Sequence, residues 1–164
     1  MKSGVTIRAD LSGKILQALK EVGKKDVLVG IPEGKSERDD SDIGNAAIGY
    51  INENGSPAQN IPARPHLVPG VRKAQSETLP LLKSAAQSIL TGDSAAANRS
   101  LEQAGTLAAN SVKSFITDAE FVPLAPATIR NRLSRGRTGD KPLIDTGQYR
   151  RSITYVVRDK NANS

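Results

Sequence analysis

Five basic side chains lie close together in the last third of the chain and form its strongest chemical feature. They are Arg130, Arg132, Arg135, Arg137 and Lys141. Guanidinium groups bind phosphate oxygens through paired N–H donors, so this spacing indicates contact with a nucleic-acid backbone or an acidic partner. No aromatic residue is interleaved with them, which argues against base stacking. We expect any DNA contact by Arg130, Arg132, Arg135 and Arg137 to be non-specific and sensitive to salt.

The net charge of +6 is confined to the end of the chain. Residues 1–120 carry 14 Lys or Arg and 14 Asp or Glu, whereas residues 121–164 carry 9 and 3. Such asymmetry is typical of a segment that binds an acidic surface. A solvated basic tail explains the charge pattern equally well, so both interpretations stay open at this point.

The other candidate motifs lack residues that their chemistry needs. Gly34-Lys35-Ser36 is similar to the end of a phosphate-binding loop, but Val29 stands where that loop needs a glycine. The acidic run Asp39–Asp42 lacks calcium-loop spacing. His66 is the only histidine and there is no cysteine, so a zinc site would depend on carboxylates. We therefore predict no catalytic residues, no metal and no cofactor, and keep a hydrolase using His66 as a third alternative.

Length and composition favour one domain over residues 1–164. Hydrophobic residues make up 37% of the chain and aromatic residues only 3%, so the core has to be built from Leu, Ile, Val and Ala. The N-terminus lacks the apolar run of a signal peptide, and no apolar stretch reaches the length of a membrane helix. We expect a protein made in a cytoplasm that does not contact a membrane.

Apolar periodicity predicts both strands and helices. The expected strands are 5–7, 26–31 and 153–157. The expected helices are 11–22, 43–51 with an end at Asn54-Gly55, 71–89 with either a kink at Pro80 or a start near Ser76, 94–116 after a new N-cap, and a short turn at 128–133. The two long helices are expected to form a hairpin. The sum is an α/β fold of the α+β type, with a small mixed or antiparallel sheet packed against two long helices and with extended loops.

The connecting segments are expected to differ in stiffness. Three prolines in residues 61–69 predict a stiff, extended strap instead of a helix. Residues 33–42 and residues 134–141 are polar and charged and lack apolar periodicity, so we expect both loops to be mobile.

The segment Pro142–Ile153 predicts a turn that leads through a short helix into a strand. Asp145 fits the N-cap position, and Gln148 three residues later completes a pair similar to a capping box. Ile144 and Tyr149 are spaced to form a hydrophobic staple across the cap. We expect this staple to pin the arginine-rich loop to the sheet.

Three stretches, in this order, resemble the tail-completion and head–tail joining proteins of long-tailed bacteriophages, the phage virion morphogenesis group. The first is Ala46–Gly55 followed by the Pro-Ala-Arg-Pro strap in Ile61–Leu67. The second is the proline-leucine stretch of Pro123–Arg132, which runs into the basic loop. The third is the Pro-Leu-Ile-Asp-Thr-Gly core of Pro142–Ile153. His66 stands where the family more usually has an aromatic residue such as Phe.

The resemblance implies a subunit of a homo-oligomeric ring, commonly sixfold, at the junction of phage head and tail. Such a ring contacts tail-tube and head-connector proteins, DNA passes through its lumen, and the protein is located in the virion after assembly in the host cytoplasm. The role as tail terminator, head closure or adaptor stays open. The alternative is a small basic nucleic-acid-binding regulator.

The resemblance and the charge pattern together predict two groups of site residues. Residues expected at a subunit or partner interface are Pro62, Ala63, Arg64, Pro65, Arg135, Arg137 and Lys141. Residues expected to anchor the basic loop are Ile144, Asp145, Thr146, Gly147 and Tyr149.

Overall fold

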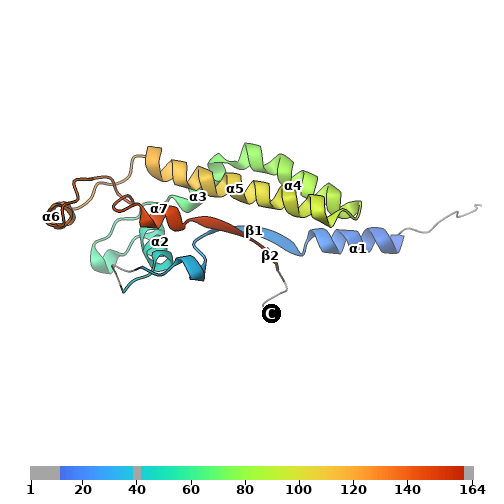
Figure 1. Ribbon diagram of the computed structural model, residues 1–164, viewed down its shortest axis with the longest axis horizontal. Coiled ribbons are helices and arrows are strands. Elements are labelled where there is room, and N and C mark those ends of the chain that lie inside the picture. Colours follow the sequence, from blue (N-terminus) through green and yellow to red (C-terminus); the bar gives the residue numbers. More distant parts are fainter. Residues whose placement is uncertain (1–11, 39–41, 161–164) are drawn as a thin grey trace, which may run out of the picture.

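Two long antiparallel helices and a two-stranded sheet form the body of the molecule (Figure 1). The structure is a computed structural model that describes residues 12–38 and 42–160. Its elements are α1 (Ser12–Val22), β1 (Lys25–Gly30), the 3₁₀ turn η1 (Glu33–Lys35), α2 (Asn45–Asn54), η2 (Pro57–Gln59), α3 (Leu67–Lys73), α4 (Gln75–Leu90), α5 (Ser94–Asp118), α6 (Pro126–Ser134), α7 (Gln148–Ser152) and β2 (Thr154–Asp159). The α+β class and the antiparallel sheet confirm the prediction from sequence.

Helix α5 is the centre of the fold. It packs against α4 on one side and against both strands on the other (Figure 1). Its buried stripe consists largely of small residues: Ala97, Leu101, Ala104, Gly105, Ala108, Ala109, Val112 and Ile116. Small side chains let neighbouring backbones approach closely, which compensates for the shortage of aromatic residues. A new N-cap before residue 94 is confirmed: Asp93 caps the helix, and its carboxylate accepts a hydrogen bond from the Ala96 N–H.

The sheet pairs a strand near the start of the described chain with the strand at its end. Strands β1 and β2 pair so that Lys25 lies opposite Asp159 and Gly30 opposite Thr154. Leu28 and Val156 are partners in this register, and both are exposed. Beyond the sheet, Val112, Ile116, Tyr149 and Ile153 form a cluster of buried apolar side chains. The strand predicted at residues 5–7 lies outside the described residues.

One of three local predictions needs correction. The strap is extended only as far as His66, because α3 begins at Leu67 and includes Pro69. A proline is tolerated there because N–H groups in the first turn have no partner within the helix. The predicted start of a helix near Ser76 is confirmed, because α4 begins at Gln75 and contains Pro80. Helix α2 ends before Gly55 as predicted.

The crossing of α3 and α5 depends on Gly70. A Cβ at this position would lie 2.7 Å from the Cα of Val112, so a larger residue has to displace the backbone of α5. We expect Gly70→Ala to lower the free energy of unfolding by about 1–3 kcal/mol, as overpacking does elsewhere. Urea unfolding followed by circular dichroism measures this change. Gly13→Ala in α1, where no atom lies within 4 Å of the added Cβ, is the control and should be neutral or slightly stabilising.

Residues 119–147 connect α5 to α7 and are here named the basic arm. The arm contains α6 and extends beyond the end of the helical hairpin (Figure 1). None of the residues of α6 is buried. Within the described residues, no helix combines the length and apolar character that a membrane crossing requires.

Candidate functional site

Three segments that are distant in sequence meet where the basic arm joins the body. They are α2 with the strap that follows it, the start of the arm, and α7 with the loop before it (Figure 1). Their contacts combine buried polar side chains with the apolar cluster around Tyr149, against which Ile48 and Ile144 pack. The buried polar residues of this region include Arg64, His66 and Ser152.

His66 joins the strap to α7. Its imidazole is 0% exposed. Nδ1 lies 2.7 Å from the Arg64 carbonyl oxygen, and Nε2 is bonded to the Tyr149 hydroxyl. We assign the proton to Nδ1, because only oxygen acceptors surround that nitrogen, and Nε2 then accepts the hydrogen bond from Tyr149. The Tyr149 hydroxyl also lies against Gly49 of α2, where an added Cβ would be 2.9 Å away.

Glu53 caps α3 from the end of α2. One oxygen, Oε2, accepts hydrogen bonds from the N–H groups of His66 and Leu67 at 2.7 and 2.9 Å. The other, Oε1, accepts from the Val68 N–H at 3.2 Å. Sequence reasoning missed this residue. A carboxylate in the last turn of a helix is unfavourable for that helix. The position of Glu53 near the end of α2 could therefore have indicated that it binds another element.

The buried groups shift each other's protonation. Burial lowers the pKa of His66, although the bond to the Arg64 carbonyl and the charge of Glu53 act in the opposite direction. Burial acts to raise the pKa of Glu53, but the N–H donors of His66, Leu67 and Val68 and the charge of His66 outweigh it and leave the pKa lowered. Burial, together with the Glu53 charge, raises the pKa of Tyr149, which keeps its hydroxyl protonated as a donor.

We expect the protein to lose stability as the pH falls from about 7 to about 5. The unfolded state takes up a proton near the ordinary pKa of 6.5, whereas the folded state resists it because the His66 pKa is lowered. The stability that neutral His66 contributes is therefore complete above this value and declines below it. Thermal unfolding across this range measures the loss.

His66→Gln is the control for this pH dependence. His66 is the only histidine, so the variant should show a flat melting temperature between about pH 7 and pH 5.5. An unchanged pH profile in the variant would show that another group is responsible.

Arg64 lies inside the molecule, which corrects its prediction as an interface residue. It is 5% exposed. Its Nε donates to the Val122 carbonyl at 2.8 Å and its Nη2 to the Pro123 carbonyl at 3.0 Å. Arg64 thereby connects the first stretch that resembles the phage proteins to the second, which begins at Pro123. Pro62, Ala63 and Pro65 remain exposed on the strap.

Arg132 organises the basic arm instead of facing a partner, which corrects its assignment as a DNA contact. Its side chain is 11% exposed. Nη1 lies 2.9, 3.0 and 2.9 Å from the carbonyl oxygens of Gly139, Lys141 and Ile144. One guanidinium thus binds backbone on both sides of the arm. It also connects the second stretch that resembles the phage proteins, Pro123–Arg132, to the third, Pro142–Ile153.

Two further cations predicted at an interface also bond within the chain. Arg137 Nη1 lies 2.5 Å from Asp145 Oδ2, and Lys141 Nζ donates to the Thr117 carbonyl at the end of α5. The pairing with Arg137 explains why Asp145 does not cap α7. The N-cap position is instead taken by Gly147, whose φ of +77° lies in the left-handed region that favours glycine. The predicted capping box is therefore wrong.

The remaining anchor residues surround this ion pair. Ile144 packs against the core cluster that contains Tyr149. The Thr146 hydroxyl oxygen lies 3.4 Å from the Gln148 nitrogen and is its acceptor. The mobility expected for residues 33–42 and 134–141 stays a prediction.

Arg130 and Arg135 are the two arm cations that point to solvent. Both are exposed, and within residues 12–38 and 42–160 neither side chain forms a hydrogen bond or an ion pair. They are the members of the predicted basic group that stay available to a partner.

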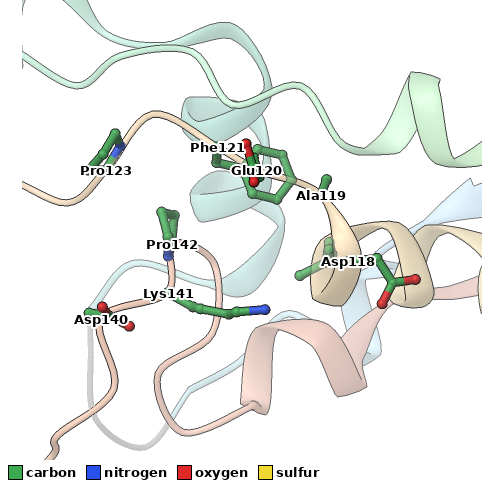
Figure 2. Close-up of a pocket in the computed structure, with 9 residues that line it drawn as sticks. Asp118, Ala119, Glu120, Phe121, Pro123, Asp140, Lys141 and Pro142 are labelled. Carbon is green, nitrogen blue, oxygen red and sulfur yellow. The ribbon is translucent and has the colours of Figure 1, made fainter.

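A pocket of about 540 Å³ lies between the end of α5 and the base of the arm (Figure 2). Phe121 lies on one side of it, and Lys141 and Pro142 lie on the other. The carboxylates of Glu120 and Asp140 are part of its lining. In the described part of the chain, no group of three His, Asp or Glu side chains is placed to hold a metal ion.

Comparison of the chain with protein-family models, with curated proteins and with solved structures found no match.

Proposed function

We propose that this protein is a subunit of a homo-oligomeric ring at a bacteriophage neck or tail end, where it completes the tail and joins it to the head. The observation that carries the proposal is the convergence of the three resembling stretches. Arg64 links the first to the second, Arg132 links the second to the third, and His66 links the first to the third. Residues that define the resemblance thus hold one common structure, the base of the basic arm.

The distribution of apolar side chains supports an assembled state. Among the described residues, fifteen large apolar side chains are exposed, whereas only five apolar residues larger than alanine are buried. Examples of the exposed group are Ile15, Leu16 and Leu19 of α1. The three α1 residues lie within five positions of a helix that has no buried residue, and a contiguous apolar patch is typical of a face that packs against another subunit. Obligate contacts commonly bury more than about 2,000 Å², and we favour a hexamer.

The ring would surround DNA and contact tail-tube and head-connector proteins in the virion. Arg130 and Arg135 are the residues placed to meet a polyanion or an acidic neighbour. Non-specific backbone contact suits a lumen through which every sequence of the genome passes. Assembly would take place in the host cytoplasm.

Two measurements test this function. Native mass spectrometry of the purified chain should give a closed oligomer, with six copies favoured. In the phage that encodes the chain, a deletion should leave heads and tails unjoined, and supplying the protein should restore joined particles. A chain that is monomeric and absent from particles would refute the proposal.

A small basic nucleic-acid-binding regulator is the second candidate. The observation that favours it is that the side chains of Arg130 and Arg135 are exposed and have no partner among the described residues. Both belong to residues 121–164, which carry the net positive charge of the chain. Gel shifts over a series of salt concentrations separate the two functions. A regulator binds free DNA as a monomer or dimer with a steep salt dependence, whereas a neck subunit assembles without DNA.

A further inference from the structure

The pocket at the base of the arm combines an apolar lining with unpaired negative charge. Phe121 and Pro142 contribute apolar surface, and Glu120 and Asp140 contribute carboxylates (Figure 2). Neither carboxylate forms an ion pair or hydrogen bond within the described residues. Lys141 is the one cation in the lining, and its ammonium is bonded to the Thr117 carbonyl. Such a pocket fits an apolar side chain flanked by cations.

The Asp118 carboxylate belongs to a different environment. It accepts a hydrogen bond from the Ser114 hydroxyl at 3.0 Å and lies 3.9 Å from Lys73 Nζ. Figure 2 shows it directed away from the pocket. The charge offered to an occupant therefore comes from Glu120 and Asp140.

Helix α6 presents the complementary pattern. Ile129 and Arg132 are half-buried and face the rest of the chain, and Arg132 binds the arm carbonyls. Arg130 and Leu133, three residues apart, lie on an exposed side, and Leu133 is 54% exposed. Arg135 follows directly after the helix. A helix of nine residues with none buried gains little stability from its own chain, because short helices depend on tertiary packing.

We propose that the exposed face of α6 in one copy docks in the pocket of the next copy, with Leu133 on the apolar lining and Arg130 and Arg135 near Glu120 and Asp140. The occupant is a second copy of this chain because its charge complements the pocket. Two cations and two carboxylates that find no partner in one chain neutralise each other between two. The contact joins different surfaces of the two copies, and such a contact closes into a ring when its rotation permits.

Charge reversal on each side tests the contact, which rests on the proposed ring function. The arm variant is Arg130→Glu with Arg135→Glu, and the pocket variant is Glu120→Lys with Asp140→Lys. Each variant places like charges in contact. We therefore expect each variant alone to need about 100-fold higher protein concentration than the unmodified chain in order to assemble. An equimolar mixture of the two variants, and the chain that carries all four changes, should assemble again because opposite charges are restored. Native mass spectrometry and sedimentation velocity measure all four samples.

The control is Arg72→Glu with Arg99→Glu, which changes the net charge as much as the arm variant does on exposed residues outside the contact. It should assemble as the unmodified chain does. If the unmodified chain is oligomeric and the arm or pocket variant assembles equally well, the docking contact is wrong while the ring stands. Loss of assembly without recovery in the mixture and in the fourfold variant also contradicts the contact. A monomeric unmodified chain contradicts the ring itself, and DNA binding lost with the arm variant in that case favours the regulator.

Discussion

Arg64→Ala is expected to lower the free energy of unfolding by about 2–4 kcal/mol. The variant removes two hydrogen bonds from a charged donor to the carbonyls of Val122 and Pro123 and leaves space where the buried side chain was. Bonds to charged groups contribute more than neutral ones. Because small domains are stable by only about 5–15 kcal/mol, this is a large fraction of the total. Urea unfolding at one fixed protein concentration measures it.

Two control variants separate the role of the Arg64 guanidinium from that of positive charge. Arg99→Ala removes an exposed cation of α5, outside the proposed docking contact, and should change stability by less than about 0.5 kcal/mol. Arg64→Lys keeps the charge but loses the planar fork that reaches two carbonyls, so it should recover only part of the loss. If Arg64→Ala were as stable as Arg99→Ala, the base of the arm would not depend on this buried residue.

Arg132→Ala is expected to open the arm between α6 and α7. The side chain is close to three carbonyl oxygens and lies 3.7 Å from Asp145. Losing a set of charge-assisted bonds worth about 1.5–3 kcal/mol should raise the population of the open arm by roughly tenfold to hundredfold. Limited trypsin digestion detects the opening as faster cleavage after Arg135 and Arg137.

The matched control for Arg132→Ala is Arg99→Ala. Each variant removes one trypsin site, but Arg99 is an exposed residue of α5 outside the arm and outside the proposed docking contact. Cleavage after Arg135 should therefore keep its original rate in Arg99→Ala. Equal rates in the two variants would contradict the role of Arg132 in holding the arm.

The framework was predictable because it depends on local patterns. The periodicity of the α5 segment, the Asp93 cap and the Gly55 stop each act within a few residues of the chain. The two strands were recognisable from their β-branched runs. The start of α4 near Ser76 was also recognisable, because Pro80 disfavours a continuous helix before it. Helix α3 was not recognisable, because the three prolines of residues 61–69 favoured an extended strap.

The site was less predictable because its contacts join residues far apart in sequence. His66 and Tyr149 are 83 positions apart, and Arg64 and Pro123 are 59 apart. Sequence treated every arginine of the basic group as available to a partner. The structure divides that group, because Arg132 and Arg137 bond within the arm while Arg130 and Arg135 do not. Whether a cation binds a carbonyl of its own chain depends on tertiary geometry that composition does not encode.

This division of the cations bears on which kind of partner the basic arm binds. A uniformly exposed cluster of cations would favour free nucleic acid as its partner. A cluster in which three of the five cations bond within the chain and two remain exposed favours a shaped contact with a defined acidic surface. The pocket lined by Glu120 and Asp140 is such a surface, and every copy of the chain carries it.

A single-particle reconstruction of the purified protein tests the central claim most directly. We expect a closed ring, with six copies favoured, in which α6 of each subunit occupies the pocket between α5 and the arm of its neighbour. A particle with one copy of the chain and an empty pocket would contradict both the ring and the docking contact.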